Sequence, residues 1–290
     1  MSEAVQALLL GLLAGGVYGL FAVGLSLSFG VLRIVNFAHG DFVMLGMYFA
    51  FVIGQSTHLP LGVIALLALV PAGLLAWLVY GMFFAGPRLQ AGTHDQLVVT
   101  IGLSILLENG IQDHFGATSQ SLNAAATPPA WHFGSNYVPL PQFEAFAVSV
   151  LLVLVFGYVL QRTPLGRAIR AVVADRRVAE LLGIRASRVF VLTFVASIVA
   201  AVVAGVFILG YLPATPDAGS EFILVGFIAV ILGGIGDLPG TFAAALLIGV
   251  AQSLVASYWS PDVEDVAAFA LFIIVALTRP RGLFGRAVAS

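Results

Sequence analysis

Polar residues interrupt an apolar run near the start of this chain, and they are well suited to contact a polar solute. Within VLRIVNFAHGDFVMLGMYFAFVIG, residues 31–54, the interruptions are Asn36, His39, Gly40 and Asp41. Backbone inside lipid must make its hydrogen bonds within the protein, so such a break survives only where it is buried or lines a watery cavity. These residues are therefore candidates for a translocation path. A structural role also fits them, with Asp41 capping the following helix and Gly40 permitting the turn.

Three further polar residues are candidates for the same path. Thr100 and Glu108 belong to the stretch TIGLSILLEN. An ionised acid within a membrane span is unfavourable by about 2.5–3.5 kcal/mol on insertion scales, so Glu108 should face another subunit, a cavity or a partner such as Asn109 or Gln112. Glu221 is the third candidate, because it occupies the acidic position of an internal repeat described below.

Residue types that the chain lacks exclude several kinds of chemistry. There is no lysine, so a phosphate-binding loop of the GxxxxGK[ST] type and a Schiff-base lysine are both excluded. There is no cysteine, so disulfides, thiolate metal sites and thiol nucleophiles are excluded. The five histidines show no metal-ligand spacing, and the net charge of −2 gives no indication of nucleic acid. We therefore expect no catalytic residues, no metal and no cofactor in this chain.

The composition is that of a polytopic membrane protein. Of the 290 residues, 60% are hydrophobic and 9% are charged, whereas soluble domains carry about 25% charged residues. Several apolar runs exceed the roughly 20 residues that cross a bilayer. We predict an all-α fold with about nine transmembrane helices, eight or ten being the alternatives. The predicted spans are 4–30, 31–55, 60–84, 97–115, 142–160, 189–211, 222–236, 241–257 and 264–278.

The arginines predict how the chain is oriented. All twelve lie at Arg33, at Arg88, in seven positions between Arg162 and Arg188, and at three positions after residue 278 (Arg279, Arg281 and Arg286). With nine alternating spans they all fall on one side, which the positive-inside rule makes the cytoplasm. The N-terminus is then outside and the C-terminus is cytoplasmic.

An internal repeat appears when the chain is shifted by 180 residues. The segment AHGDFVMLG, residues 38–46, then aligns with AGSEFILVG, residues 218–226, without a gap, and Asp41 meets Glu221. Chance similarity between apolar helices is the alternative explanation. Because five spans separate the copies, the two are expected to lie in opposite orientations, as in the inverted repeats of many transporters.

The only long charged stretch is RTPLGRAIRAVVADRRVAELLGIRASR, residues 162–188. Pro164 suits a helix start and Gly183 suits a helix stop, so two short amphipathic helices across the cytoplasmic face are expected. A basic loop that touches anionic lipid is one interpretation. Docking of a cytoplasmic protein is the other, and the mixture of small, basic and acidic residues favours it.

Four segments together resemble the permease subunits of branched-chain amino acid ABC importers. They are LSLSFGVLRIVNFAHGDFVMLGMY, TIGLSILLEN, TPLGRAIRAVVADRRVAELLGI (163–184) and AVILGGIGDLPGTFAAALLIGV (229–250), in order along almost the whole chain. The same family includes permeases for urea, short amides and related polar amino acids.

The resemblance implies partners and a coupling element. The partners would be a second, homologous permease subunit, two P-loop ATPase subunits and a periplasmic solute-binding protein, besides membrane lipid and without nucleic acid. The segment 163–184 would receive the ATPase stroke, through Gly166, Arg167, Arg170, Ala171, Glu180 and Gly183. Its middle, Ala174–Arg177, is less acidic than is usual in the family.

We therefore expect residues 1–290 to form one transmembrane permease domain containing the coupling loop 162–188. It would be a multi-pass protein of the bacterial inner membrane that imports branched-chain or related small amino acids by alternating access, driven by its partner ATPases. The alternatives are a urea or short-amide ABC permease and an ATP-independent secondary transporter. An intramembrane enzyme is least favoured.

Overall fold

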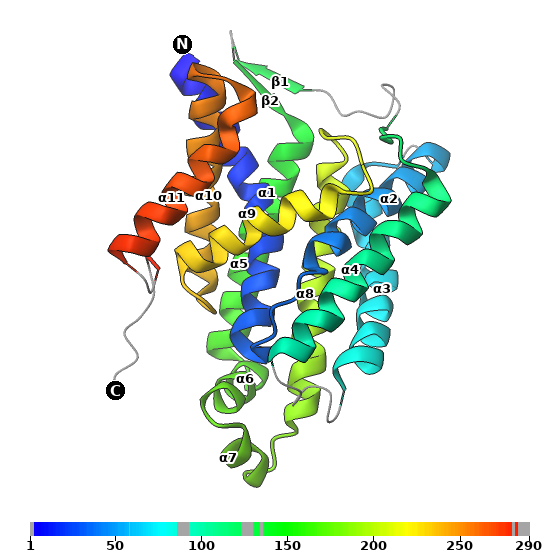
Figure 1. Cartoon of the computed structure of the whole chain (residues 1–290), viewed down its shortest axis with the longest axis vertical. Helices are drawn as coiled ribbons and strands as arrows, with labels where there is room; N and C mark the ends of the chain where they lie inside the picture. The colour runs from blue at the N-terminus through cyan, green and yellow to red at the C-terminus, as the bar shows by residue number, and fades with distance from the viewer. Residues whose placement is uncertain are drawn as a thin grey trace.

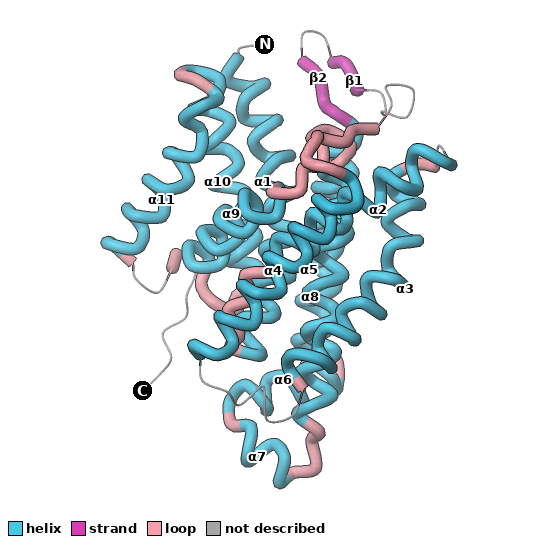
Figure 2. The backbone as a smooth tube through the Cα atoms, turned by 45° about the vertical axis from the view of Figure 1, so that its right-hand side comes forward, coloured by secondary structure: helices cyan, strands magenta, loops and turns pink. Residues whose placement is uncertain are grey.

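The computed structural model describes residues 3–57, 59–85, 93–122, 130–133, 136–279 and 282–283. These residues form a bundle of helices with one small β-hairpin at an end (Figures 1 and 2). Arg88, Arg281 and Arg286, which were used to predict the orientation, lie outside the described residues.

The first part of the chain contains four long helices. They are α1 (Glu3–Leu32), α2 (His39–Thr57), α3 (Leu61–Val79), which continues into the π-helical turn η1 (Tyr80–Phe84), and α4 (Thr93–Phe115). The antiparallel strands β1 (Ala130–Phe133) and β2 (Asn136–Pro139) follow. They lie between the predicted spans 97–115 and 142–160.

The remaining elements begin with α5 (Leu140–Arg162) and two short helices, α6 (Pro164–Ala174) and α7 (Arg176–Leu181). After them come α8 (Ala186–Ile208), α9 (Ala218–Gly233), α10 (Leu238–Tyr258), the 3-10 turn η3 (Pro261–Val263) and α11 (Glu264–Thr278). In Figure 1, α6 and α7 lie at one end of the bundle, and the first turn of α1 and the hairpin lie at the other.

Helices α1 and α8 form the centre of the bundle. In their most apolar stretches 67% and 72% of the residues are buried, against 11% in α5. Glycines allow α1 to lie unusually close to α10: a Cβ atom on Gly15 would be 2.6 Å from the Cα atom of Leu246, and one on Gly11 would be 2.7 Å from that of Val250. The poorly buried face of α5 is apolar, as expected of a surface that meets lipid.

The prediction of an all-helical, multi-span membrane protein is confirmed. Among the described residues, five helical segments are long and apolar enough to cross a membrane, namely Glu3–Leu32, Leu61–Phe84, Leu140–Arg162, Ala186–Ile208 and Leu238–Tyr258. Helix α9 is apolar but shorter. The count of nine spans, the inverted repeat and the orientation stay predictions.

One predicted span has a different form. The segment 31–55 is not continuous, because α1 ends at Leu32 and α2 begins only at His39. Arg33 between them has a φ angle of 58°, a left-handed conformation that is uncommon for a residue with a side chain. This turn separates the two helices and directs the chain back into the bundle.

Candidate translocation path and coupling element

The start of α2 lies deep in the bundle, beside the middle of α1. His39 Nε2 is 3.2 Å from the backbone carbonyl oxygen of Phe21. Phe21 precedes the end of α1 at Leu32 by eleven residues, which corresponds to about 16 Å along a helix. The segment 33–38 therefore runs back along α1 before α2 begins.

The first turns of α2 and α9 meet at two glycines. A Cβ atom on Gly40 would collide with the carbonyl oxygen of Gly219, and a Cβ atom on Gly219 would collide with the side chain and backbone of Asp41. Only residues without a side chain allow this approach. Because the N-terminus of a helix carries a partial positive charge, two such charges converge at this place.

Buried polar side chains surround this meeting point. Asn36, His39 and Thr100 are fully buried and Asp41 is 3% exposed. Among the described residues, both amide atoms of Asn36, Nδ1 of His39 and Oδ2 of Asp41 have no hydrogen-bond partner within the protein. An unpaired buried group is unfavourable by about 1–3 kcal/mol, so a cluster of them is expected where water or a solute completes the hydrogen bonds.

Helix α4 contributes further polar groups to the cluster. The Thr100 hydroxyl donates to the carbonyl oxygens of Val35 (3.3 Å) and Leu97 (3.1 Å). Ser104 forms a side-chain hydrogen bond with Asp41, and Glu108 interacts with Asp41 electrostatically. The structure thus brings Asn36, His39, Gly40, Asp41, Thr100 and Glu108 to one region.

Glu221 and Asn109 interact with other groups than the residues of this cluster. Glu221 lies on a different side of α9 from Gly219, and it interacts electrostatically with Asp217 and Asp265. Asn109 donates one hydrogen bond to the carbonyl oxygen of Ile105, within its own helix, at 2.7 Å.

Ser104 and Gly219 were missed in the sequence. Ser104 precedes Glu108 by four residues, a spacing that places both on one helix face. That spacing could have identified Ser104 from the sequence. The proximity of Gly219 to Gly40 cannot be detected from the residues next to either glycine.

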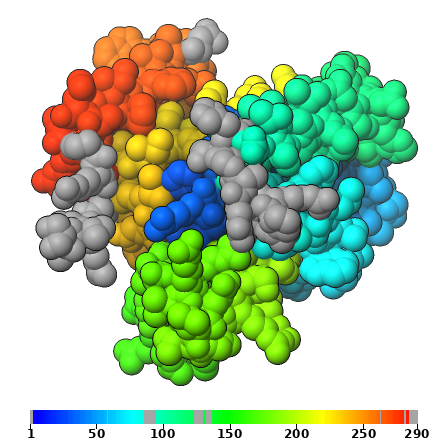
Figure 3. All heavy atoms as spheres, turned by 60° about the horizontal axis from the view of Figure 1, so that its bottom comes forward, coloured from blue at the N-terminus to red at the C-terminus, as the bar shows by residue number. Residues whose placement is uncertain are grey.

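The predicted cytoplasmic element forms α6 and α7, which protrude from the bundle in Figure 3. Thr163 caps α6 by accepting a hydrogen bond from the Gly166 amide at 3.2 Å, and Pro164 occupies the first turn. Asp175 caps α7 by accepting from the Val178 amide at 3.0 Å. Gly183 ends the element with a φ angle of 83°. The predicted start at Pro164 and stop at Gly183 are confirmed.

The residues assigned to coupling have distinct positions. Gly166 is buried so close to the carbonyl groups of Val159 and Leu160 that no side chain would fit. Arg170 donates to the carbonyl oxygen of Leu160. Glu180 pairs with Arg176 at 3.0 Å. Arg167 is exposed and Ala171 is half-buried.

Two residues of the element not singled out in the sequence are strongly exposed. Leu181, the last residue of α7, is 87% exposed, and Leu182, which follows it, is 75% exposed. Two adjacent leucines before a terminating glycine are the sequence signal that could have identified this apolar tip.

The sequence of this chain is similar to those of known transport proteins. A family model described as the permease component of branched-chain amino acid transport systems matches residues 7–276. The high-affinity branched-chain amino acid permease protein LivH of Salmonella typhimurium is 32% identical, over 97% of this chain and 96% of its own length. BraD of Pseudomonas aeruginosa is 33% identical over the same shares. The autoinducer 2 import permease LsrD of Yersinia enterocolitica is 28% identical over 72% of this chain and 66% of its own.

Proposed function

Because this chain belongs to the family of permease components of branched-chain amino acid transport systems, we propose that it forms the membrane path for inward transport of branched-chain or related small amino acids. It is a transport subunit of an ABC importer and not an enzyme, since the ATPase of such a system is a separate subunit. The family resemblance noted in the sequence is confirmed.

The close approach of the first turns of α2 and α9 is the main observation that supports the proposed path. An amino acid presents a carboxylate, and the converging helix N-termini favour a negative group. The unpaired atoms of Asn36, His39 and Asp41 offer hydrogen bonds beside them. Phe42 and Phe222, both buried, supply apolar side chains next to these groups. These features suit a solute with a charged end and an aliphatic end.

Helix pairing supports the proposed inverted repeat. Shifted by 180 residues, α1 overlaps α8, α2 overlaps α9 and α3 overlaps α10. The contacts of α1 with α10 and α9 correspond to the contacts of α8 with α3 and α2. In Figure 1, α1 leads toward the end where α6 and α7 lie, and α8 leads away from it.

Each of the two acids of the repeat lies near a second acid on another helix. Asp41 of α2 interacts with Glu108 of α4, and Glu221 of α9 interacts with Asp265 of α11. Helices α4 and α11 overlap only in part under the same shift. In transporters built from two related halves, movement of one half against the other is a known basis for alternating access.

We propose that α6 and α7 are the coupling element and face the cytoplasm, which places the N-terminus outside. Residues 1–290 would be one permease domain in the bacterial inner membrane, with 162–188 as its cytoplasmic loop. The complex would contain a second homologous permease, two P-loop ATPases and a periplasmic solute-binding protein. The exposed leucines of α7 would contact an ATPase.

Reconstitution tests the proposed function. The complex in proteoliposomes, supplied with binding protein, should accumulate leucine, isoleucine or valine only when ATP is present on the ATPase side. Urea and acetamide should not be accumulated. Leucine transport by the isolated chain without any ATPase would overturn the proposal.

Asp41 gives a sharper test of the path. Replacing Asp41 with Ala removes the partner of Ser104 and a buried polar group, so uptake should fall by about tenfold or more, the equivalent of roughly 1.4 kcal/mol. ATPase binding should be unchanged. Asp113→Ala, at an exposed site on α4, is the matched control and should transport normally. Full uptake in Asp41→Ala would exclude Asp41 from the path.

A further inference from the structure

A groove of 900 Å³ lies on the side of the bundle between α3, α5 and α8. Helix α8 contacts both neighbouring helices and forms the floor of the groove, where Ala200 and Val203 are buried. Leu69 of α3 and Leu151 of α5 are exposed at the rim, so the groove is open along one side. None of the described residues of the cluster around Asp41 lines it, so the groove is separate from the proposed path.

The lining of the groove matches hydrocarbon. All of its described lining residues are apolar except Thr193, whose side chain is buried. Helices α3, α5 and α8 belong to the segments that are long and apolar enough to cross a membrane. In a bilayer the open side of the groove therefore faces lipid. A free amino acid or a nucleotide would leave its polar groups without partners along this surface, whereas a lipid acyl chain suits all of it.

The length of the groove also fits an acyl chain. Its lining extends over twelve residues of α5, from Val148 to Leu160, and over fifteen residues of α8, from Leu192 to Phe207. These spans correspond to about 18 and 22 Å along a helix. One leaflet of a bilayer contributes about 15 Å of hydrocarbon, so the groove can hold a chain along its full depth.

A transmembrane helix of another protein would fit less well. A helix with its side chains is about 10–12 Å across, so a 20 Å length of it occupies roughly 1,600–2,300 Å³. The groove provides 900 Å³. A partner helix could therefore enter it only in part, whereas a flexible chain one methylene wide can follow it throughout.

Two arginines extend the groove at the end where α6 lies. Arg162 follows Val159 of α5 by three residues, and Arg188 precedes Leu192 of α8 by four residues. Residues three or four apart share one face of a helix. The helix faces that line the groove therefore each continue into a positive charge at this end.

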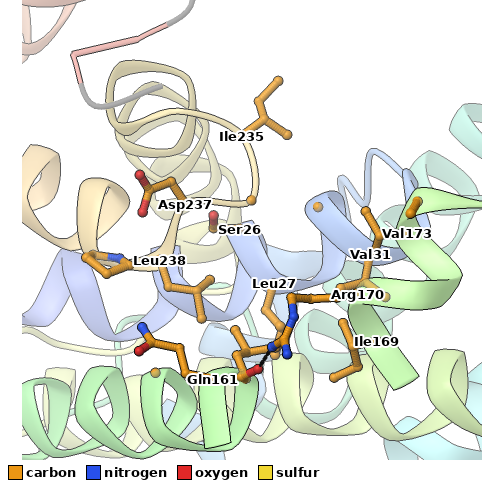
Figure 4. A pocket seen from close by; sticks show the side chains of 16 residues that line it. Ser26, Leu27, Val31, Gln161, Ile169, Arg170, Val173, Ile235, Asp237 and Leu238 are labelled. Carbon is orange, nitrogen blue, oxygen red and sulfur yellow. Dashed lines mark hydrogen bonds between the residues drawn. The ribbon is translucent and has the colours of Figure 1, made fainter. Parts of the chain in front are cut away.

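Both of these guanidinium groups are available to a ligand. Arg162 and Arg188 are exposed, and in the described part of the chain neither side chain takes part in a hydrogen bond, an ion pair or a contact with an aromatic ring. Arg170, by contrast, donates to the carbonyl oxygen of Leu160 (Figure 4). A guanidinium group matches the geometry of a phosphate group, so this end of the groove favours an anionic head group.

We propose that an anionic phospholipid of the cytoplasmic leaflet binds in this groove, with its phosphate on Arg162 and Arg188 and an acyl chain along α5 and α8. The proposal rests on the proposed function for the side of the membrane that supplies the lipid. Basic sites beside transmembrane helices on the cytoplasmic side suit anionic head groups. Because α5 leads into α6 and α8 follows α7, the lipid joins the two ends of the coupling element, and ATP-driven transport depends on it.

Native mass spectrometry tests the head-group contacts. The full chain in detergent should be titrated with dioleoyl phosphatidylglycerol and with dioleoyl phosphatidylcholine, which have the same acyl chains. The unmodified chain should bind the anionic lipid about tenfold more tightly, as expected for charge-assisted hydrogen bonds. The double variant Arg162→Gln, Arg188→Gln should lose this preference. Equal affinity of the unmodified chain for the two lipids would overturn the proposal, as would a preference that survives in the double variant.

Arg177→Gln is the matched control for loss of a positive charge. Arg177 is also exposed near this end of the bundle, on α7, and does not line the groove. This variant should keep the preference for phosphatidylglycerol. An equal loss of preference in Arg177→Gln would show that the lipid responds to net charge, and it would overturn the assignment to Arg162 and Arg188.

A neighbouring pair of residues on α5 tests the groove itself. Val155 lines the groove and Leu154 does not, and both are exposed. Val155→Trp should fill the groove and weaken the binding of both lipids by about tenfold, whereas Leu154→Trp should bind both as the unmodified chain does. Unchanged affinity in Val155→Trp would exclude the groove. Inorganic phosphate, compared with chloride at equal ionic strength, should not displace the lipid; displacement would assign the site to a free anion and overturn the proposal.

Transport by the assembled complex provides the last measurement. In proteoliposomes of phosphatidylcholine, ATP-driven leucine uptake should be several-fold slower than in vesicles that also contain phosphatidylglycerol, and the double variant should not respond to that lipid. Uptake that is independent of phosphatidylglycerol would overturn the proposed dependence. Absence of the bound lipid from the assembled complex would mean that a partner subunit covers the groove, and would overturn the site. Failure of branched-chain uptake in every lipid would overturn the proposed function, while the mass spectrometry would still decide the lipid site.

Discussion

Single residues determine how closely the two halves of the bundle approach at the proposed path. Gly40 and Gly219 lie so near each other that either Cβ atom would meet the opposite helix. Around them, Asn36, His39 and Asp41 keep polar atoms unpaired in a buried place. Such atoms lower stability unless water or a solute engages them, so their presence is explained better by transport than by folding.

Gly40→Ala should destabilise the protein. Its Cβ atom would force α2 away from the backbone of α9, and overpacking of this kind lowers the free energy of unfolding by about 1–3 kcal/mol. Thermal unfolding in detergent, followed by tryptophan fluorescence, should show a lower midpoint.

Gly62→Ala is the control for that change. Gly62 is also helical, but a Cβ atom there would meet nothing within 4 Å. The unfolding midpoint of Gly62→Ala should therefore equal that of the unmodified protein or be slightly higher. Identical midpoints for Gly40→Ala and the unmodified protein would contradict the close approach.

At the scale of elements, α6 is attached to the end of α5 by several specific contacts. Thr163 caps it, Gly166 lies against the carbonyl groups that end α5, and Arg170 donates to one of them. Helix α7 is joined to α8 through Arg176, whose guanidinium carbon lies 5.5 Å from the centre of the Phe190 ring. Motion of α6 and α7 would therefore be transmitted to α5 and α8, and α8 contacts α2 directly.

Asp175→Ala should weaken α7. Removing a helix cap lowers stability by about 0.5–2 kcal/mol, and a six-residue helix has little else to hold it. Affinity for the cognate ATPase, measured by surface plasmon resonance on the detergent-solubilised chain, should fall by several-fold. Asp175→Asn preserves the cap and should retain the affinity; equal losses in both variants would point to the charge and not to the helix.

Leu181→Ser should reduce ATPase binding without affecting the fold, because this side chain is 87% exposed and contributes little to the core. A central apolar contact at an interface is worth about 1–2 kcal/mol or more, so affinity should fall by about tenfold. Leu66→Ser on α3 is the control for exposure, at 67%, and should bind normally. Unchanged binding by Leu181→Ser would exclude the tip of α7 from the interface.

At the scale of the whole molecule, the strongly charged element and the β-hairpin lie at opposite ends of an apolar bundle (Figure 1). Five helical segments between those ends are suited to cross a membrane. The arginines of α6, α7 and their flanks favour the cytoplasmic side for that end. A pocket lined by α6 and by the turn between α9 and α10 lies at that end too.

Labelling can establish the orientation, because the chain has no cysteine of its own. A membrane-impermeant maleimide applied to intact spheroplasts should label Trp259→Cys, at the C-terminal end of α10. Leu181→Cys in α7 should react only after permeabilisation. The two native residues are 83% and 87% exposed, so accessibility within the protein is matched. The reverse pattern would invert the proposed orientation.

Local chemistry explains what was predictable from the sequence. Hydropathy alone identified a multi-span membrane protein, since each segment that crosses a bilayer must be apolar whatever it contacts. Pro164 and Gly183 marked the ends of the coupling element because helix caps act over a few residues. The family motifs are also contiguous, and the family was recognised from them.

Only the tertiary structure decided which distant residues meet. It placed the start of α2 beside Phe21, set Gly219 against Gly40 and brought Glu221 near Asp265. It also brought Arg170 and Asp237 to one pocket from positions 67 residues apart. Such pairs depend on how helices cross and how closely they approach. These are properties of packed surfaces, and the order of residues along the chain does not record them.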